Sequence, residues 1–173
     1  MSEMRIMTVR QPWAWAIIHG GKDVENRVRN IAGDYRGQVA IHVAQAIDTQ
    51  AMTQPTEALK DAAALHARRH PDPLDGGPWF NNRGAIIGIV DLVDVHVVQQ
   101  GHTGRNVCFD STTPAGGICS QWAHAYDEFP AYRGHHLVLA NPRPLSEPIP
   151  FKGALGLRRL DEAMVQRIEA AIA

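Results

Sequence analysis

The longest β-strand signal in the sequence is AIIGIVDLVDVHVV, residues 85–98. Apolar and β-branched residues run almost without interruption through this stretch, which favours a strand over a helix. A strand of this length exceeds the usual five or six residues or so, so we expect a bend or a β-bulge within it, as in small barrels.

Shorter signals complete the expected set of elements. Further strands are expected at residues 4–10, 23–29, 38–44, 135–145 and 148–160. Helices are expected at 12–19, at 48–69 with an interruption at Pro55, at 118–126 and at 160–172, and loops at 30–37, 71–84 and 99–117. Several strands with few helices between them predict an α+β fold, a small and mostly antiparallel β-barrel with helices packed outside.

Length and composition indicate one domain, residues 1–173, because 45% hydrophobic residues suffice for a core and no linker or repeat divides the chain. No stretch approaches the roughly 18 apolar residues that a membrane span needs, and the first residues do not resemble a secretory signal. The two cysteines, Cys108 and Cys119, do not form a disulfide framework. These features predict a cytoplasmic protein without membrane association.

Charge is distributed unevenly although the formal net charge is only −1. Residues 1–37 carry +2 and residues 133–159 carry +4, whereas residues 38–132 carry −5. If the two basic segments meet in the fold, they form a local positive patch that would attract an anionic ligand.

The stretch TVRQPWAWAIIHGGKDVENR, residues 8–27, contains the most informative charges, Lys22, Glu25 and Arg27. Alternation places Glu25 and Arg27 on one face of a strand, and Lys22 follows a helix end from which its side chain can reach the same space. Such charges often form only a solvated strand face. Around a ligand, lysine and arginine would bind a phosphate or oxyanion, while glutamate would accept from an amino or hydroxyl group.

Six further residues are candidates for the same site, each with an ordinary structural alternative. Arg10 and Gln11 precede a helix N-terminus, which attracts anions, but they could serve only to cap the helix. The ring of Trp13 could stack on a base or belong to the core. His42 lies between two alanines that leave space beside the imidazole. The turn residues Tyr35 and Arg36 could contact a ligand or simply form a hairpin.

No metal site and no cofactor are predicted. The chain has nine histidines as well as two cysteines, but no pair has the spacing of a zinc ribbon, and the adjacent His135 and His136 would point to opposite faces of a strand. No glycine-rich phosphate loop is present. Asp91 falls in an apolar register of the 85–98 strand, which predicts an ion pair with an arginine unless a bulge turns it outward.

The order of several motifs resembles the ASCH domain, the activating-signal-cointegrator homology domain of the PUA-like superfamily. The matching motifs are Arg10-Gln11-Pro12-Trp13-Ala14, Gly21-Lys22-x-x-Glu25-x-Arg27, Tyr35-Arg36-Gly37 and Ile41-His42, with GAIIGIVDLVDV, LANPRPL and KGALGL further on. Residues 46–84 and 99–117 match no motif and are predicted to be insertions.

The resemblance implies a β-barrel with a cleft between barrel and helices, and association with RNA, DNA or modified bases. Some ASCH proteins hydrolyse the amide of 4-acetylcytidine with a lysine, a threonine and a glutamate, and others are proposed to cut RNA. Lys22 matches that lysine, but Glu25 stands in place of the threonine. For the glutamate, Asp91 and Glu128 are candidates by residue type only.

Three hypotheses follow. The first is a nucleic-acid-binding ASCH module for RNA or a modified base, whose site consists of Arg10, Gln11, Trp13, Lys22, Glu25, Arg27, Tyr35, Arg36 and His42. The second is an enzyme, an amidohydrolase or a ribonuclease, in which Lys22 and Glu25 are catalytic. The third is a scaffold that binds a protein partner through the acidic middle of the chain and the insertions.

Overall fold

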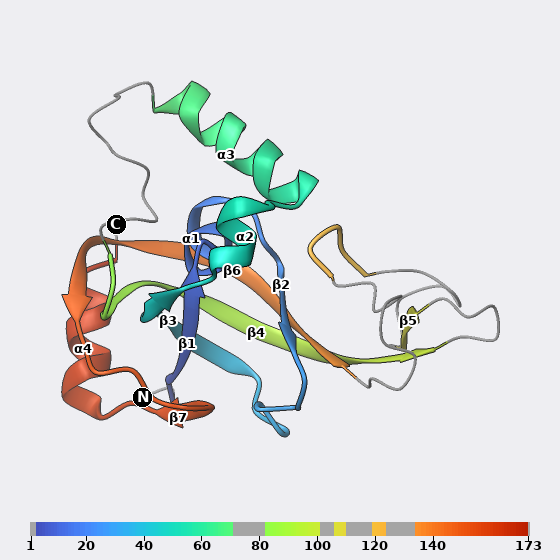
Figure 1. Ribbon diagram of the computed structural model, residues 1–173. Helices are drawn as coiled ribbons and strands as arrows, with labels where there is room; N and C mark the ends of the chain where they lie inside the picture. Colours follow the sequence, from blue (N-terminus) through green and yellow to red (C-terminus); the bar gives the residue numbers. More distant parts are fainter. Residues whose placement is uncertain (1–2, 71–81, 101–105, 110–118, 124–133, 173) are drawn as a thin grey trace.

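The computed structural model describes residues 3–70, 82–100, 106–109, 119–123 and 134–172 (Figure 1). Its strands are β1 (Arg5–Gln11), β2 (Val24–Arg27), β3 (Gly37–Ile47), β4 (Ala85–Gln100), β5 (Asn106–Phe109), β6 (Gly134–Pro150) and β7 (Leu157–Arg159). Its helices are α1 (Trp13–His19), α2 (Thr49–Thr53), α3 (Glu57–Arg69) and α4 (Glu162–Ala170). No helix in these ranges is long and apolar enough to cross a membrane.

The strands form one curved sheet in the order β2-β6-β4-β3-β1-β7, with β5 paired to β4. All pairs are antiparallel except β1 with β3. The α+β, mostly antiparallel prediction is therefore confirmed, but the prediction of a closed barrel is wrong for the described strands, because β2 and β7, the two strands that end the sheet, do not pair with each other. The physical reason lies in β1, whose outer edge is covered by β7 only over Arg5–Met7.

Where the outer edge of β1 has no strand paired to it, a side chain of β2 forms a hydrogen bond with the backbone of β1. Nη2 of Arg27, on β2, donates a hydrogen bond of 3.0 Å to the carbonyl oxygen of Thr8, on β1. An arginine thus connects β2 to β1, and a space remains between these two strands. This space becomes the candidate site described below.

The long β4 strand contains irregularities of the β-bulge kind that its length predicts. Its pairing with β6 shifts register between Ile86 and Gly88, between Ile89 and Asp91, and between Leu92 and Asp94. Gly88 lies in the first irregularity, where an added Cβ would come within 2.8 Å of the Arg143 carbonyl oxygen. Asp91 forms the expected ion pair with an arginine, Arg143, and also accepts from Asn141 at 2.8 Å.

Several predicted boundaries need correction. Within the loop expected at 99–117, residues 99–100 belong to β4 and residues 106–109 form β5, which pairs with β4, while residues 101–105 and 110–118 lie outside the described ranges. Residues 119–123, expected in a helix, form a turn, while 124–126 are not described. The two strands expected at 135–145 and 148–160 are instead the continuous strand β6 followed by the short strand β7. The predicted interruption of the helix at Pro55 is confirmed by the break between α2 and α3.

The sheet has a core on each face. On one face α1 covers a cluster that includes Met7, Val39, Ile41 and Val43, so the alternation predicted for residues 38–44 is confirmed. On the other face α4 covers a second cluster. Its members come from the residue before β1, from β1, β3, β4 and β6, and from the C-terminal part: Met4, Ile6, Ala40, Ile86, Ile89, Leu145, Ile149, Leu160 and Ile168.

Candidate ligand-binding cleft

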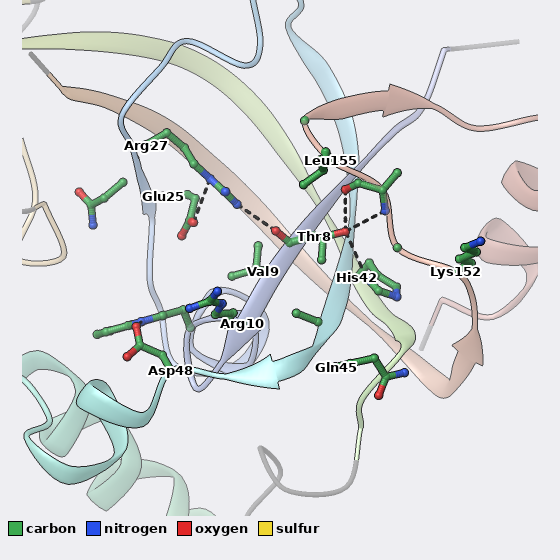
Figure 2. Close-up of a pocket in the computed structure, with 16 residues that line it drawn as sticks. Thr8, Val9, Arg10, Glu25, Arg27, His42, Gln45, Asp48, Lys152 and Leu155 are labelled. Carbon is green, nitrogen blue, oxygen red and sulfur yellow. Dashed lines mark hydrogen bonds and ion pairs between the residues drawn. The ribbon is translucent and has the colours of Figure 1, made fainter.

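A cleft of about 740 Å³ opens where β1 and β2 separate (Figure 2). Its volume lies within the range of small-molecule sites. Its walls are β1, β2, β3, the start of α2 and the segment 152–156 that precedes β7. The lining residues are Thr8, Val9, Arg10, Trp13, Glu25, Asn26, Arg27, His42, Ala44, Gln45, Asp48, Lys152, Gly153, Ala154, Leu155 and Gly156.

The hydroxyl of Thr8 links one wall to the 152–156 segment. It lies 3.0 Å from the carbonyl oxygen of Ala154, accepts from the Ala154 amide at 3.2 Å, and lies 3.2 Å from Nδ1 of His42. Gly153 allows this approach, because an added Cβ would lie 2.5 Å from Cε1 of His42. The segment is therefore held against the sheet, and the adjacent Leu155 projects with 91% exposure at the rim.

His42 is fixed in one tautomer. Its Nε2 lies 2.9 Å from the carbonyl oxygen of Phe151, and because a carbonyl only accepts, Nε2 carries the proton. Burial lowers the pKa of His42 below its ordinary value, although the Phe151 carbonyl opposes the shift. The ring is therefore neutral at pH 7, and Nδ1 presents a lone pair toward the Thr8 hydroxyl.

Glu25 and Arg27 form the opposite wall, as their predicted alternation requires. Nε of Arg27 lies 3.2 Å from Oε1 of Glu25, while its Nη2 reaches Thr8. Figure 2 shows both side chains directed toward the space beside Thr8. The Arg27 guanidinium thus has two fixed partners and also lines the cleft.

Lys22 does not line this cleft. The residue is only 3% exposed, and its Nζ donates to the Val24 carbonyl oxygen and lies 3.7 Å from Oε2 of Glu25. Nζ also lies 5.6 Å and 6.0 Å from the ring centroids of Trp13 and Trp122. Burial lowers the pKa of Lys22, and Glu25 and Asp23 oppose that shift. Lys22 therefore contacts a residue of the cleft, Glu25, without lining the cleft itself.

Trp13 and Asp48 form the floor beside Arg10. Nε1 of Trp13 donates to Oδ2 of Asp48 at 2.9 Å, and the other carboxylate oxygen accepts from the Ala51 amide at the start of α2. Burial raises the pKa of Asp48, but these hydrogen bonds and the charge of Arg10 outweigh it and hold the pKa below its usual value. Asp48 is therefore a carboxylate at neutral pH.

The other predicted site residues lie elsewhere. Gln11 is buried, and its side-chain oxygen caps α1 by accepting from the Trp15 amide at 3.0 Å. The hydroxyl of Tyr35 hydrogen-bonds backbone carbonyls, and Arg36 pairs with Asp94 at 3.4 Å. The structure thus brings five of the nine to the cleft: Arg10, Trp13, Glu25, Arg27 and His42. Glu128 lies outside the described ranges.

The sequence analysis did not identify several residues that line the cleft. Thr8, Asp48 and the segment 152–156 line it, but none of them was a candidate. The segment belongs to the motif KGALGL, which matches the family pattern, and this match could have indicated that the segment contributes to the site. Its Lys152 comes from the second basic segment, whereas Arg10 and Arg27 come from the first. The two basic ends of the chain therefore meet at the cleft.

The fold is α+β, with one open mixed sheet covered by helices, and a cleft with charged side chains in its lining lies beside β1. The sequence matches the ASCH domain over residues 7–149, and the chain belongs to this family. The fold agrees with crystal structures of two mutants of the ASCH protein from Zymomonas mobilis. A tyrosine-to-phenylalanine mutant is 14% identical, with a TM-score of 0.53 and coverage of 99% of this chain and 100% of that one.

A serine-to-alanine mutant of the same Zymomonas mobilis protein is also 14% identical, with a TM-score of 0.50. The match covers 98% of this chain and 96% of the other. At this identity the likeness concerns the fold. No curated protein matches the sequence.

Proposed function

We propose that this ASCH protein binds RNA or a modified base in the cleft between β1 and β2. The observation that carries the proposal is the meeting of three cations, Arg10, Arg27 and Lys152, around one nucleotide-sized space that also contains hydrogen-bonding side chains. Phosphate contacts supply much of the affinity for nucleic acids, and base-edge hydrogen bonds supply selectivity.

The positions of the side chains suggest a division of roles. Arg10 and Lys152 are exposed at the rim, where they can contact phosphates without disturbing the fold. Glu25 and Asp48 lie deeper and can accept hydrogen bonds from the amino groups of a base. Leu155 and the half-buried ring of Trp13 offer apolar surface for a base inserted between them.

Replacement of the rim cations tests this proposal. Arg10→Ala and Lys152→Ala should each weaken binding of a short single-stranded RNA roughly three- to tenfold at low salt. Each should also reduce the slope of log affinity against log salt by about 0.7, the value for one lost phosphate contact on a single strand. Fluorescence anisotropy at several salt concentrations, with single-stranded DNA and duplex DNA in parallel, measures both quantities.

The matched controls are Arg68→Ala and Lys60→Ala, which remove exposed cations from α3, away from the cleft. They should bind RNA as the wild type does. Equal losses in the cleft variants and in the controls would indicate a diffuse electrostatic effect and contradict the assignment. Absence of binding to every nucleic acid would favour the scaffold hypothesis, in which the ligand is a protein.

A second candidate function, hydrolysis of a modified-nucleoside amide or of RNA, is favoured by the contact between Thr8 and His42. The single proton of the Thr8 hydroxyl is donated to the Ala154 carbonyl oxygen at 3.0 Å, and a rotation of the O–H would redirect it to the unprotonated Nδ1 of His42 at 3.2 Å, the arrangement of a nucleophile and its base. In amide hydrolysis, Thr8 would attack the acyl carbon while His42 accepts its proton. His42 would then protonate the leaving amine, and water would release the acyl group.

Turnover of N4-acetylcytidine to cytidine and acetate tests this candidate, with RNA length monitored on gels in parallel. Thr8→Val should lower kcat at least about a hundredfold, because it removes the hydroxyl without changing the size of the side chain much. Thr53→Val, at an exposed threonine of α2, is the matched control. Wild-type turnover in Thr8→Val would exclude Thr8 as nucleophile, and no turnover of either substrate would exclude the second candidate.

A further inference from the structure

Near the C-terminal end of β4, β5 pairs with β4 (Figure 1). A second group of chemically reactive side chains lies there. It comprises His96 on β4, Cys108 on β5 and Cys119 in the 119–123 turn. One ligand-type atom from each lies within 4.8 Å of the others. None of these residues belongs to the cleft.

His136 on β6 adds a fourth side chain to this group. It is paired directly with His96 across the β4–β6 ladder, so the two rings share one face of the sheet. Nδ1 of His136 lies 3.2 Å from Sγ of Cys108 and 3.3 Å from Sγ of Cys119. For a tetrahedral zinc with ordinary bond lengths, the corresponding nitrogen–sulfur distance is about 3.6 Å.

The surroundings of the group also suit a bound metal ion. His136, Cys108 and His96 are buried, and Cys119 is half-buried. Nε2 of His96 lies 3.2 Å from Oδ2 of Asp94. A carboxylate beside one ring nitrogen is the common outer partner of a metal-ligating histidine, because it fixes the ring and leaves Nδ1 to face the metal.

We propose that His96, Cys108, Cys119 and His136 bind one structural zinc ion. Two sulfur and two nitrogen ligands form the donor set that selects zinc, and four protein ligands leave no open position for a substrate. On binding, the two thiols become thiolates and release two protons to the solvent, so no oxidant or reductant is required.

The spacing along the sequence did not reveal this site, because zinc ribbons are recognised by ligands close together in the chain. Here His96 and His136 come from neighbouring long strands, and the cysteines come from the hairpin strand and from a turn. His135 and His136 point to opposite faces as expected, and only His136 faces the group.

The zinc would anchor the 119–123 turn to the sheet, and this turn supports the wall of the cleft. The hydroxyl of Ser120 donates to Asp23, and the Trp122 carbonyl oxygen accepts from Asn26, on β2, at 2.9 Å. The Trp122 ring lies beside the Lys22 ammonium. Metal binding at one end of the sheet would therefore stabilise β2, which carries Glu25 and Arg27.

The test is metal analysis of the full-length protein purified without added metal and without a histidine tag. We expect one zinc per chain, lost on treatment with a strong chelator and regained from zinc chloride. Cobalt substituted for zinc should show sulfur-to-cobalt charge transfer and the intense visible bands of a tetrahedral site. Chelation should lower the melting temperature, and zinc should restore it.

Cys108→Ser and Cys119→Ser should each abolish one-to-one zinc binding, whereas His135→Gln, on the opposite face of β6, should retain it. Thiol titration separates the proposal from a disulfide: both thiols should react slowly with zinc present and fully after chelation. Wild-type protein that contains no zinc and takes up none would overturn the proposal, whether or not the variants fold. An oxidised Cys108–Cys119 pair in freshly purified protein, or uptake unchanged in both serine variants, would overturn it equally.

Discussion

Replacing Glu25 by glutamine should lower the free energy of unfolding by about 3 kcal/mol at pH 7. The reason is Lys22, whose ammonium is almost completely buried and lies 3.7 Å from the Glu25 carboxylate. Removing one partner of a buried ion pair leaves the other charge without compensation in a medium of low polarity. Urea denaturation followed by tryptophan fluorescence measures the change.

The chain contains a matched control for this prediction. Glu57 and Lys60 also form a lysine–glutamate pair three residues apart, but on the exposed surface of α3, with 84% and 51% of the side chains accessible. Glu57→Gln should change the free energy of unfolding by less than about 0.5 kcal/mol, because water already solvates both charges. The difference between the two variants isolates the effect of burial.

Two further measurements test the cause. Lys22→Met removes the buried charge, so adding Glu25→Gln to that variant should lower stability by much less than in the wild type. Burial already lowers the pKa of Lys22, and loss of Glu25 removes the carboxylate that opposes the shift. In Glu25→Gln, Lys22 therefore binds its proton much more tightly in the unfolded chain than in the folded one. The loss of stability relative to the wild type should then become smaller as the pH rises toward 10.5, the ordinary pKa of lysine.

A Glu25→Gln variant as stable as Glu57→Gln would mean that the Lys22 ammonium is stabilised mainly by the Val24 carbonyl and the two tryptophan rings. An equal loss with and without Lys22 would instead assign the effect to the contact between Glu25 and Arg27. A stability change alone would not bear on ligand binding. The rim variants at Arg10 and Lys152 therefore remain the test of function.

What could be predicted from the sequence depended on local patterns. The alternation of Val39, Ile41 and Val43 is set by the pleat of a single strand, and the structure has these residues in one cluster. The Asp91 register similarly predicted an arginine partner, which is Arg143. In each case the deciding interaction repeats at the period of the element, so a short window of sequence contains it.

The position of Lys22 could not be predicted in this way. Gly21 has a positive φ of 72°, and the amide of Lys22 donates to the Ala16 carbonyl oxygen at 2.9 Å. This turn folds the chain back beneath α1, so the lysine lies inside the protein although it follows the helix directly. The contact of Thr8 with Ala154, 146 residues away in the chain, likewise depends on how the sheet curves.

Arg27→Lys should lower both stability and ligand affinity although it preserves the charge. The arginine contacts Glu25 through Nε and the Thr8 carbonyl through Nη2, across the gap where β1 and β2 do not pair. A lysine ammonium has no second nitrogen and cannot reproduce this geometry. We expect the free energy of unfolding to fall by about 1.5–3 kcal/mol, the range for a lost hydrogen bond to a charged group.

Affinity for single-stranded RNA should fall at least about tenfold in Arg27→Lys, because the wall carrying Glu25 is no longer held at a fixed distance from Thr8. Arg29→Lys, just beyond β2 and exposed, is the matched control and should leave both quantities unchanged. Since the charge is conserved, the salt dependence of binding should stay close to that of the wild type. A variant with normal stability and weak binding would show that Arg27 contacts the ligand directly. Normal stability together with normal affinity would show that the contacts of Arg27 with Glu25 and Thr8 contribute little to either quantity.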